Sequence, residues 1–284
     1  EKLKRVEKKI DDHLFADNPG KTDERLDKLS GEVMRLSHAL ERDRESMQRD
    51  MRSIDRTLGT LDGPGVRFVL FLQGCPLRCG YCHNPETRDA NGGKTATVKD
   101  VMQKVLRCRN YFGKDGGVTV SGGEPLMQAK FVTELFKECK RQGINTCLDT
   151  SGCIMNDDVT ELLKVTDLCM LDIKMTNDED YRKHIGCCLD APLKFLDKLT
   201  EMNVETWIRQ VTVCGVNDDD TNIKRLNDIA NKHENVTFAE LLPFRKLCKT
   251  KYDDMGIEFP FDCYPETSQN VIERLKPELD KFKF

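Results

Sequence analysis

Three cysteines lie close together in the first third of the chain: Cys75, Cys79 and Cys82. Gly74 opens this segment and indicates a loop. Thiolates are the ligands that iron–sulfur clusters prefer, and three of them on a four-iron cluster would leave one iron open to bind a substrate. The spacing is also compatible with a structural zinc that takes His83 or a distant cysteine as fourth ligand, with haem attached through a C-x-x-C-H pattern, or with thiols that are simply buried.

A second group of polar residues follows other apolar segments. Gly122 and Gly123 would let a ligand approach the backbone closely, and Glu124 offers a carboxylate to an ammonium group. An ordinary strand-to-helix turn has the same composition. Asp149 and Asp172 each end an apolar segment, where an unpaired buried carboxylate would be costly.

Two cations could neutralise those carboxylates. Lys174 follows Asp172 closely and could pair with it, which would be a purely structural role. Arg209 lies among apolar residues of another segment, and a charge at such a position indicates an anionic ligand or an internal salt bridge.

The elements that must position these residues alternate along the chain. Strand-like apolar runs occur at 66–72, 118–120, 145–149, 168–173, 206–213 and 236–242, and helix-like stretches at 98–111, 129–141, 157–163, 192–202, 219–232 and 268–281. This alternation predicts an α/β fold with a parallel sheet, and six units favour a partial (β/α)6 barrel. Because reactive residues of such folds collect where the strands end, we expect the polar groups above to share one rim.

The first 52 residues have a different composition, with 26 charged side chains and no cysteine. Apolar residues recur at heptad spacing between Leu26 and Leu40, after a turn signal at 18–20. We expect a helical, coiled-coil-like extension over 1–52 that mediates self-association, followed by the α/β domain over 53–284. A highly charged, partly disordered leader is the alternative.

Composition argues against several classes of protein. The net charge is −4, with 45 basic and 49 acidic residues, which disfavours an electrostatic nucleic-acid binder. The longest apolar run is too short to cross a membrane, and no signal-like segment opens the chain. Thirteen cysteines without such a segment indicate reduced thiols, and therefore the cytoplasm or a reducing, anaerobic organelle.

Taken together, these residues resemble the radical S-adenosylmethionine enzymes, whose C-x-x-x-C-x-x-C motif the three cysteines match. More narrowly, the chain is similar to the pyruvate formate-lyase activating enzymes, a family of glycyl-radical-enzyme activases. The matching segments extend from about residue 53 to the C-terminus: GTLDGPGVR at 59–67, FLQGCPLRCGYCHN at 71–84, GGVTVSGGE at 116–124, TCLDTSG at 146–152, MLDIK at 170–174, WIR at 207–209 and ELLP at 240–243.

The resemblance implies a [4Fe–4S] cluster on the three cysteines, with S-adenosylmethionine chelated to the fourth iron. It implies cofactor contacts at Tyr81, His83, Gly122, Gly123, Glu124, Asp172, Lys174, Arg209 and Arg245. It further implies a monovalent cation on Asp149, Thr150, Asp172 and the Met170 carbonyl, and a substrate peptide near Asp62 and His83. Arg245 stands where the family usually has a histidine, so its cofactor contact departs from the family pattern.

The implied activity is removal of a hydrogen atom from one glycine of pyruvate formate-lyase by a 5′-deoxyadenosyl radical, with a flavodoxin or ferredoxin as electron donor. Two alternatives are an activase of another glycyl radical enzyme and, from a different class, a zinc-stabilised, non-catalytic binding protein. Many other activases carry a ferredoxin-like insert between the cysteine loop and the Gly-Gly-Glu turn. Here only 39 residues separate Cys82 from Gly122, and Cys108 is the sole cysteine among them, which favours the formate-lyase type.

Overall fold

The computed structural model describes residues 58–59 and 62–281, so the predicted helical extension over 1–52 lies outside the described residues. One sheet of seven strands has the order β1-β2-β3-β4-β5-β6-β7. Its six parallel strands confirm the predicted ones and are β2 (Arg67–Leu72), β3 (Gly117–Gly122), β4 (Asn145–Thr150), β5 (Leu168–Asp172), β6 (Glu205–Thr212) and β7 (Val236–Pro243). The short strand β1 (Leu58–Gly59), which was not expected, pairs with β2 in the antiparallel direction.

Helices alternate with these strands as the apolar pattern predicts. They are α3 (Val98–Cys108), α4 (Ala129–Arg141), α5 (Asp157–Leu163), α6 (Asp178–Ile185), α7 (Asp190–Glu201), α8 (Asp220–Asn231), α9 (Lys249–Met255) and α10 (Gln269–Leu275). Two of them, α6 and α9, were not expected. The predicted closing helix is shorter than 268–281, since α10 gives way at Lys276 to a 3-10 turn that contains Pro277. No described helix is long and apolar enough to cross a membrane.

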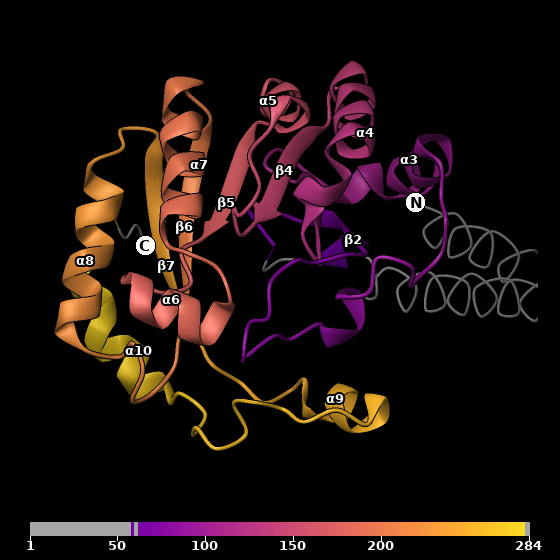
Figure 1. Cartoon of the computed structure of the whole chain (residues 1–284). Helices are drawn as coiled ribbons and strands as arrows, with labels where there is room; N and C mark the ends of the chain where they lie inside the picture. The colour runs from indigo at the N-terminus through magenta and orange to yellow at the C-terminus, as the bar shows by residue number, and fades with distance from the viewer. Residues whose placement is uncertain (1–57, 60–61, 282–284) are drawn as a thin grey trace, which may run out of the picture. The chain divides into compact units, whose positions relative to one another are not determined.

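The strand order explains why the helices cover the sheet as they do. Each parallel strand lies beside the next one in the chain, so every crossover proceeds in the same direction. Right-handed crossovers then place their helices on the same face, as α4, α5, α7 and α8 illustrate (Figure 1). The opposite face of the sheet is left for the site, and the predicted partial (β/α)6 barrel is confirmed.

Alternation along the strands separates the core from the site. Leu148, Leu171 and Ile208 are fully buried in the main apolar core together with the residues of the covering helices. Their strand neighbours Asp149 and Arg209 point to the other face, where they line a cavity. Because side chains of a strand alternate between the two faces, one apolar pattern fixes both the core and the polar interior.

Arg67 is buried at the start of β2 with a relative exposure of 0%. Its guanidinium donates to the Thr119 hydroxyl at 2.7 Å and to the Asn145 side-chain oxygen at 2.7 Å. Four backbone carbonyls, those of Pro64, Asp115, Val118 and Asn145, accept the remaining hydrogen bonds. The Thr119 hydroxyl in turn donates to the carbonyl of Asp62, so this network fixes the segment that carries Asp62.

Candidate active site

The three cysteines lie on the loop that follows β2, and the unexpected helix α6 holds this loop. The amide of Arg78 donates to the carbonyl of Ile185, and that of Gly80 donates to the carbonyl of His184, both at 2.9 Å. The last carbonyls of a helix have no partner within it, so the cysteine loop satisfies the end of α6 while α6 fixes the loop. Tyr181 and Ile185 of α6 also belong to a second apolar cluster beneath the loop.

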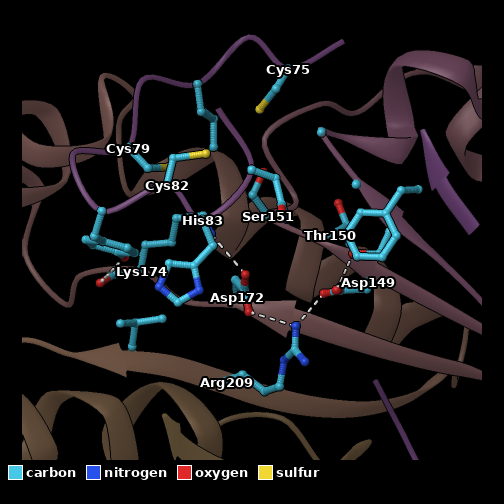
Figure 2. Close-up of a pocket in the computed structure, with 18 of the residues that line it drawn as sticks. Cys75, Cys79, Cys82, His83, Asp149, Thr150, Ser151, Asp172, Lys174 and Arg209 are labelled. Atoms are coloured by element: carbon cyan, nitrogen blue, oxygen red, sulfur yellow. Dashed lines mark hydrogen bonds and ion pairs between the residues drawn. The ribbon is translucent and has the colours of Figure 1, made fainter. Parts of the chain in front are cut away.

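Cys75, Cys79 and Cys82 line a cavity of about 280 Å³ (Figure 2). Burial raises the pKa of the Cys79 thiol to about 12, so binding of a metal there must displace a proton. Among the described residues, no three or more His, Cys, Asp or Glu side chains are grouped so that they could hold a metal ion. A single zinc ion needs its donors within about 2.0–2.3 Å, whereas a four-iron cluster spreads its thiolates over a larger body.

Two carboxylates and two cations, Asp149, Asp172, Lys174 and Arg209, also line the cavity (Figure 2). Arg209 Nη2 lies 2.5 Å from Asp149 Oδ1 and 3.4 Å from Asp172 Oδ1, and Lys174 Nζ donates to Asp172 Oδ2 at 2.9 Å. The Ser121 hydroxyl donates to the second oxygen of Asp149 at 2.6 Å. Burial would raise the pKa of Asp172, but Lys174 and Arg209 outweigh it and lower that pKa. The internal ion pairs considered for Lys174 and Arg209 are thus present.

The register of the sheet brings these charges together. Arg209 on β6 lies directly beside Asp172 on β5, and Asp149 on β4 lies beside Met170 on β5. Asp149, Thr150 and Asp172 line the cavity, whereas Met170 lines a neighbouring one. Arg209 already places a positive charge between the two carboxylates. The monovalent cation at these residues stays a prediction.

Gly122 and Gly123 also line the cavity. A Cβ on Gly122 would lie 2.3 Å from the amide nitrogen of Leu72, and one on Gly123 would lie 2.3 Å from the carbonyl oxygen of Gly74. Gly122 also has a φ of +112°, which side chains rarely tolerate. The close approach that these glycines allow is therefore, first of all, that of the end of β2 and the start of the cysteine loop to the end of β3.

Glu124 is buried and is not among the residues that line the cavity. Its Oε1 accepts from the Leu126 amide at 3.1 Å and from the Thr150 hydroxyl at 2.5 Å. Its Oε2 accepts from the Ser151 amide at 3.0 Å and the Ser151 hydroxyl at 2.5 Å. The carboxylate thus fixes the loop after β4, and its predicted contact with the methionine amine stays a prediction.

Three predicted contacts surround the mouth of the cavity. Tyr81 and His83 line it, and Tyr81 is buried with its hydroxyl 3.4 Å from the Lys174 carbonyl. Nε2 of His83 lies 2.9 Å from the carbonyl oxygen of Arg245. The side chain of Arg245 is not among the residues that line the cavity, so the structure brings its backbone to the site, and its predicted cofactor contact stays a prediction.

A second cavity of about 840 Å³ adjoins the first on the inner face of the sheet. The two share Asp62, His83 and Arg209 as lining residues. Burial and the neighbouring charge of Asp149 raise the pKa of Asp62. The residues predicted to meet a substrate peptide, Asp62 and His83, therefore lie where the two cavities meet.

Sequence reasoning assigned no role to Ser121 and Ser151, which line the cavity and anchor Asp149 and Glu124. For Ser121 a signal was available. It lies two residues after Thr119 on β3, and a polar residue at every second position indicates the inner face of a strand. Ser151 lies in a loop, where no periodicity could identify it.

Comparison with known proteins identifies the family to which this chain belongs. Residues 69–226, more than half of the chain, match the family model of the radical SAM superfamily, and the chain belongs to that superfamily. It is 44% identical over 227 residues to the pyruvate formate-lyase 1-activating enzyme of Escherichia coli (strain K12), across 79% of this chain and 92% of that protein. Within the superfamily it thus belongs with the pyruvate formate-lyase activating enzymes.

Two further comparisons agree. The pyruvate formate-lyase-activating enzyme of Clostridium pasteurianum is 42% identical over 204 residues, which cover 72% of this chain and 85% of that protein. The crystal structure of Streptococcus suis SuiB bound to precursor peptide SuiA superimposes with a TM-score of 0.54 at 16% identity, over 71% of this chain and 44% of that one. At this identity the likeness shows the fold alone.

Radical SAM enzymes use a [4Fe–4S] cluster and S-adenosylmethionine, and the residues of the cavity fit both groups. Thiols on one side suit a cluster. S-adenosylmethionine carries an ammonium, a carboxylate and a sulfonium, and the same cavity offers charges of both signs. Nε of Arg209 is buried and has no hydrogen-bond partner among the described residues, so a carboxylate ligand would satisfy it.

Proposed function

We propose that this chain activates pyruvate formate-lyase by generating a radical on the Cα atom of one of its glycines. The observation that carries the proposal is that the cysteine-lined cavity adjoins a larger one through Asp62, His83 and Arg209. A reactive centre on the cysteine side could therefore reach a chain segment held on the other side. The 44% sequence identity to the Escherichia coli activating enzyme, over 92% of that enzyme's length, supports the choice of partner.

Each part of the cavity has a role in this proposal. When bound, the cluster, once reduced by one electron, and S-adenosylmethionine would supply the radical chemistry that removes a hydrogen atom from the glycine Cα. Cys75, Cys79 and Cys82, which line the cavity together, would hold the cluster. The side chains of Lys174 and Arg209, already fixed by their ion pairs, would orient the methionine carboxylate with little loss of rotamer freedom.

The larger cavity is proposed to receive the glycine-bearing segment. Trp207 and Phe238 pack edge to face there, with ring centroids 5.0 Å apart, and Leu247 at the rim is 80% exposed. Such an apolar lining would hold a peptide and exclude water from a reactive radical. Asp62 and His83 would meet the peptide where it enters the smaller cavity.

The test is anaerobic reconstitution with iron and sulfide, followed by reductant, S-adenosylmethionine and pyruvate formate-lyase. The intact chain should form 5′-deoxyadenosine and a glycyl radical signal on the partner. Cys79→Ala should form neither, whereas Cys263→Ala, which replaces an exposed cysteine, should behave like the unmodified chain. Formation of deoxyadenosine by Cys79→Ala would contradict the assignment of the cluster to the three cysteines. Cofactor cleavage without a radical on pyruvate formate-lyase would indicate another glycyl radical enzyme as substrate.

We further propose a flavodoxin or ferredoxin as electron donor and a reducing compartment, the cytoplasm or an anaerobic organelle. All thirteen cysteines are free thiols, which suits a reducing environment. Reduction of the reconstituted chain by purified flavodoxin and ferredoxin, compared by electron paramagnetic resonance (EPR), would identify the donor. Failure of both to reduce a cluster that dithionite reduces would contradict this proposal.

A further inference from the structure

The backbone carbonyls of all three cysteines accept a hydrogen bond from a side chain. Arg78 Nη1 donates to the carbonyl of Cys75 at 3.1 Å. Arg88 Nη2 donates to the carbonyl of Cys79 at 2.8 Å, and the hydroxyl of Tyr252 donates to that of Cys82 at 3.1 Å. Arg78 is exposed, whereas the other two donors are shielded from solvent to different degrees.

Arg88 is tied to the cysteine loop by its backbone as well as its side chain. Its carbonyl accepts from the amide of Cys75, and the carbonyl of the preceding Thr87 accepts from the amide of Gly74 at 2.8 Å. Its Nε is buried without a hydrogen-bond partner, and no carboxylate of the described chain forms an ion pair with it. Within the described part of the chain, the guanidinium thus holds a positive charge at the Cys79 carbonyl with no carboxylate at ion-pair distance.

Tyr252 links this charge to the third cysteine. Arg88 Nη2 lies 3.3 Å from the hydroxyl of Tyr252, and the guanidinium carbon lies 5.9 Å from the centre of its ring. Tyr252 is fully buried on α9 and packs against Phe259 with ring centroids 4.8 Å apart. Residues 164 positions apart in the sequence thus act together on the carbonyls of Cys79 and Cys82.

We propose that Arg88 and Tyr252 are positioning residues for the iron–sulfur cluster, and that the Arg88 charge favours its reduced form. This inference rests on the proposed function, which assigns the cluster to the three cysteines. Reduction adds one negative charge to the cluster, and a nearby cation without a counter-ion stabilises that charge more than the charge of the oxidised form. Hydrogen bonds and charges around the ligands are known means of tuning such clusters.

The test is a redox titration of the reconstituted full chain, followed by the EPR signal of the reduced cluster. At a fixed solution potential, Arg88→Met should lower the ratio of reduced to oxidised cluster by about tenfold. Arg88→Lys retains the charge and should change the ratio less than about threefold. Arg78→Met is the matched control, because the exposed cation of Arg78 is screened by water and should have a smaller effect than Arg88.

Tyr252→Phe separates positioning from charge. It removes one hydroxyl from a buried site, so the reduced-to-oxidised ratio should change little while a chelator removes iron several times faster. An unchanged ratio in Arg88→Met, or equal shifts in Arg88→Met and Arg78→Met, would overturn the charge assignment. Iron release at the unmodified rate in Tyr252→Phe would overturn the positioning role of Tyr252.

The outcome for an unstable variant is also defined. If Arg88→Met takes up no cluster while Arg88→Lys does and titrates normally, the charge is needed to retain the cluster, which supports the proposal. If both take up none but still unfold cooperatively, the charge assignment is overturned. None of these measurements uses S-adenosylmethionine or formate-lyase, so a normal titration without a glycyl radical would contradict the proposed function alone.

Discussion

At the scale of single residues, the site is a set of buried charges that neutralise one another. Arg209 and Asp149 expose only 9% and 12% of their side chains, and Asp172 lies against both Arg209 and Lys174. A buried ion pair adds little net stability, but removing one partner leaves the other charge unpaired and is costly. Replacing Arg209 alone should therefore lower the stability of the fold.

We expect Arg209→Met to lower the free energy of unfolding by about 3 kcal/mol, since it strands the carboxylate of Asp149 with the Ser121 hydroxyl as its remaining partner. Urea denaturation of the metal-free chain would measure the loss. The double variant Asp149→Asn/Arg209→Met should recover part of it because neither charge remains. A loss below about 1 kcal/mol for Arg209→Met would show that water reaches Asp149.

Glu124 gives a second prediction. The backbone amides of Leu126 and Ser151 donate to opposite oxygens of its carboxylate, and an amide side chain offers a single acceptor oxygen. We therefore expect Glu124→Gln to cost about 2 kcal/mol and to weaken S-adenosylmethionine binding, measured by denaturation and calorimetry. Glu134→Gln, on the exposed face of α4, is the control and should change neither quantity. Full cofactor affinity in Glu124→Gln would separate Glu124 from the cofactor site.

How much of the site could be predicted differs between residues for physical reasons. Asp149, Asp172 and Arg209 were predictable because a charge in an apolar strand needs a partner, and parallel strands bring such charges to one face. The role of Glu124 was not predictable, since its partner Ser151 lies 27 positions away in another loop. The pairing of Arg88 with Tyr252 depends in the same way on tertiary structure.

At the scale of elements, the six parallel strands and their covering helices followed from apolar periodicity, but α6 and α9 did not. Tyr252 is the one buried residue of α9, so that helix has no apolar stripe to detect. The residues of α6 are mostly charged, and it buries Tyr181, His184 and Ile185. Both helices pack around the cysteine loop, and this tertiary packing rather than an apolar repeat accounts for them.

Asp167 joins two elements and gives a prediction of pH dependence. It accepts from the amide and hydroxyl of Thr146 on β4, each at 3.0 Å, and from Lys140 on α4. Burial opposes ionisation, but these donors outweigh it and lower the pKa of Asp167 below 3.8. The unfolded chain therefore binds the proton more readily, so this stabilisation is present above pH 3.8 and is lost as the pH falls through the lower folded pKa.

We expect Asp167→Asn to cost about 1 kcal/mol at pH 7 and to make the free energy of unfolding fall less steeply below about pH 4. Urea titrations at several pH values would measure the slope. Glu161→Gln removes an exposed ion pair of α5 and should leave the slope unchanged. Equal slopes in Asp167→Asn and the unmodified chain would assign the acid sensitivity to other carboxylates.

At the scale of the whole molecule, we propose that residues 1–52 serve self-association rather than chemistry, because their charged heptad pattern contains no cysteine. A chain of residues 53–284 should bind iron as the full chain does but should sediment with fewer chains per particle at equal concentration. Analytical ultracentrifugation and iron analysis would measure both. An unchanged number of chains per particle would contradict the role in association, and loss of iron binding would contradict the division at residue 52.

The buried guanidinium of Arg67 couples the strands at the base of the sheet. Its charge is solvated by oxygen atoms of β3, the start of β4 and the loop around Pro64, in place of water. If any one of these segments moved away, the Arg67 guanidinium would lose hydrogen-bond acceptors before water could replace them. The amide hydrogens of β2, β3 and β4 should accordingly exchange with solvent deuterium at one shared opening free energy, and so the region that holds Asp62 should open only as a single cooperative unit.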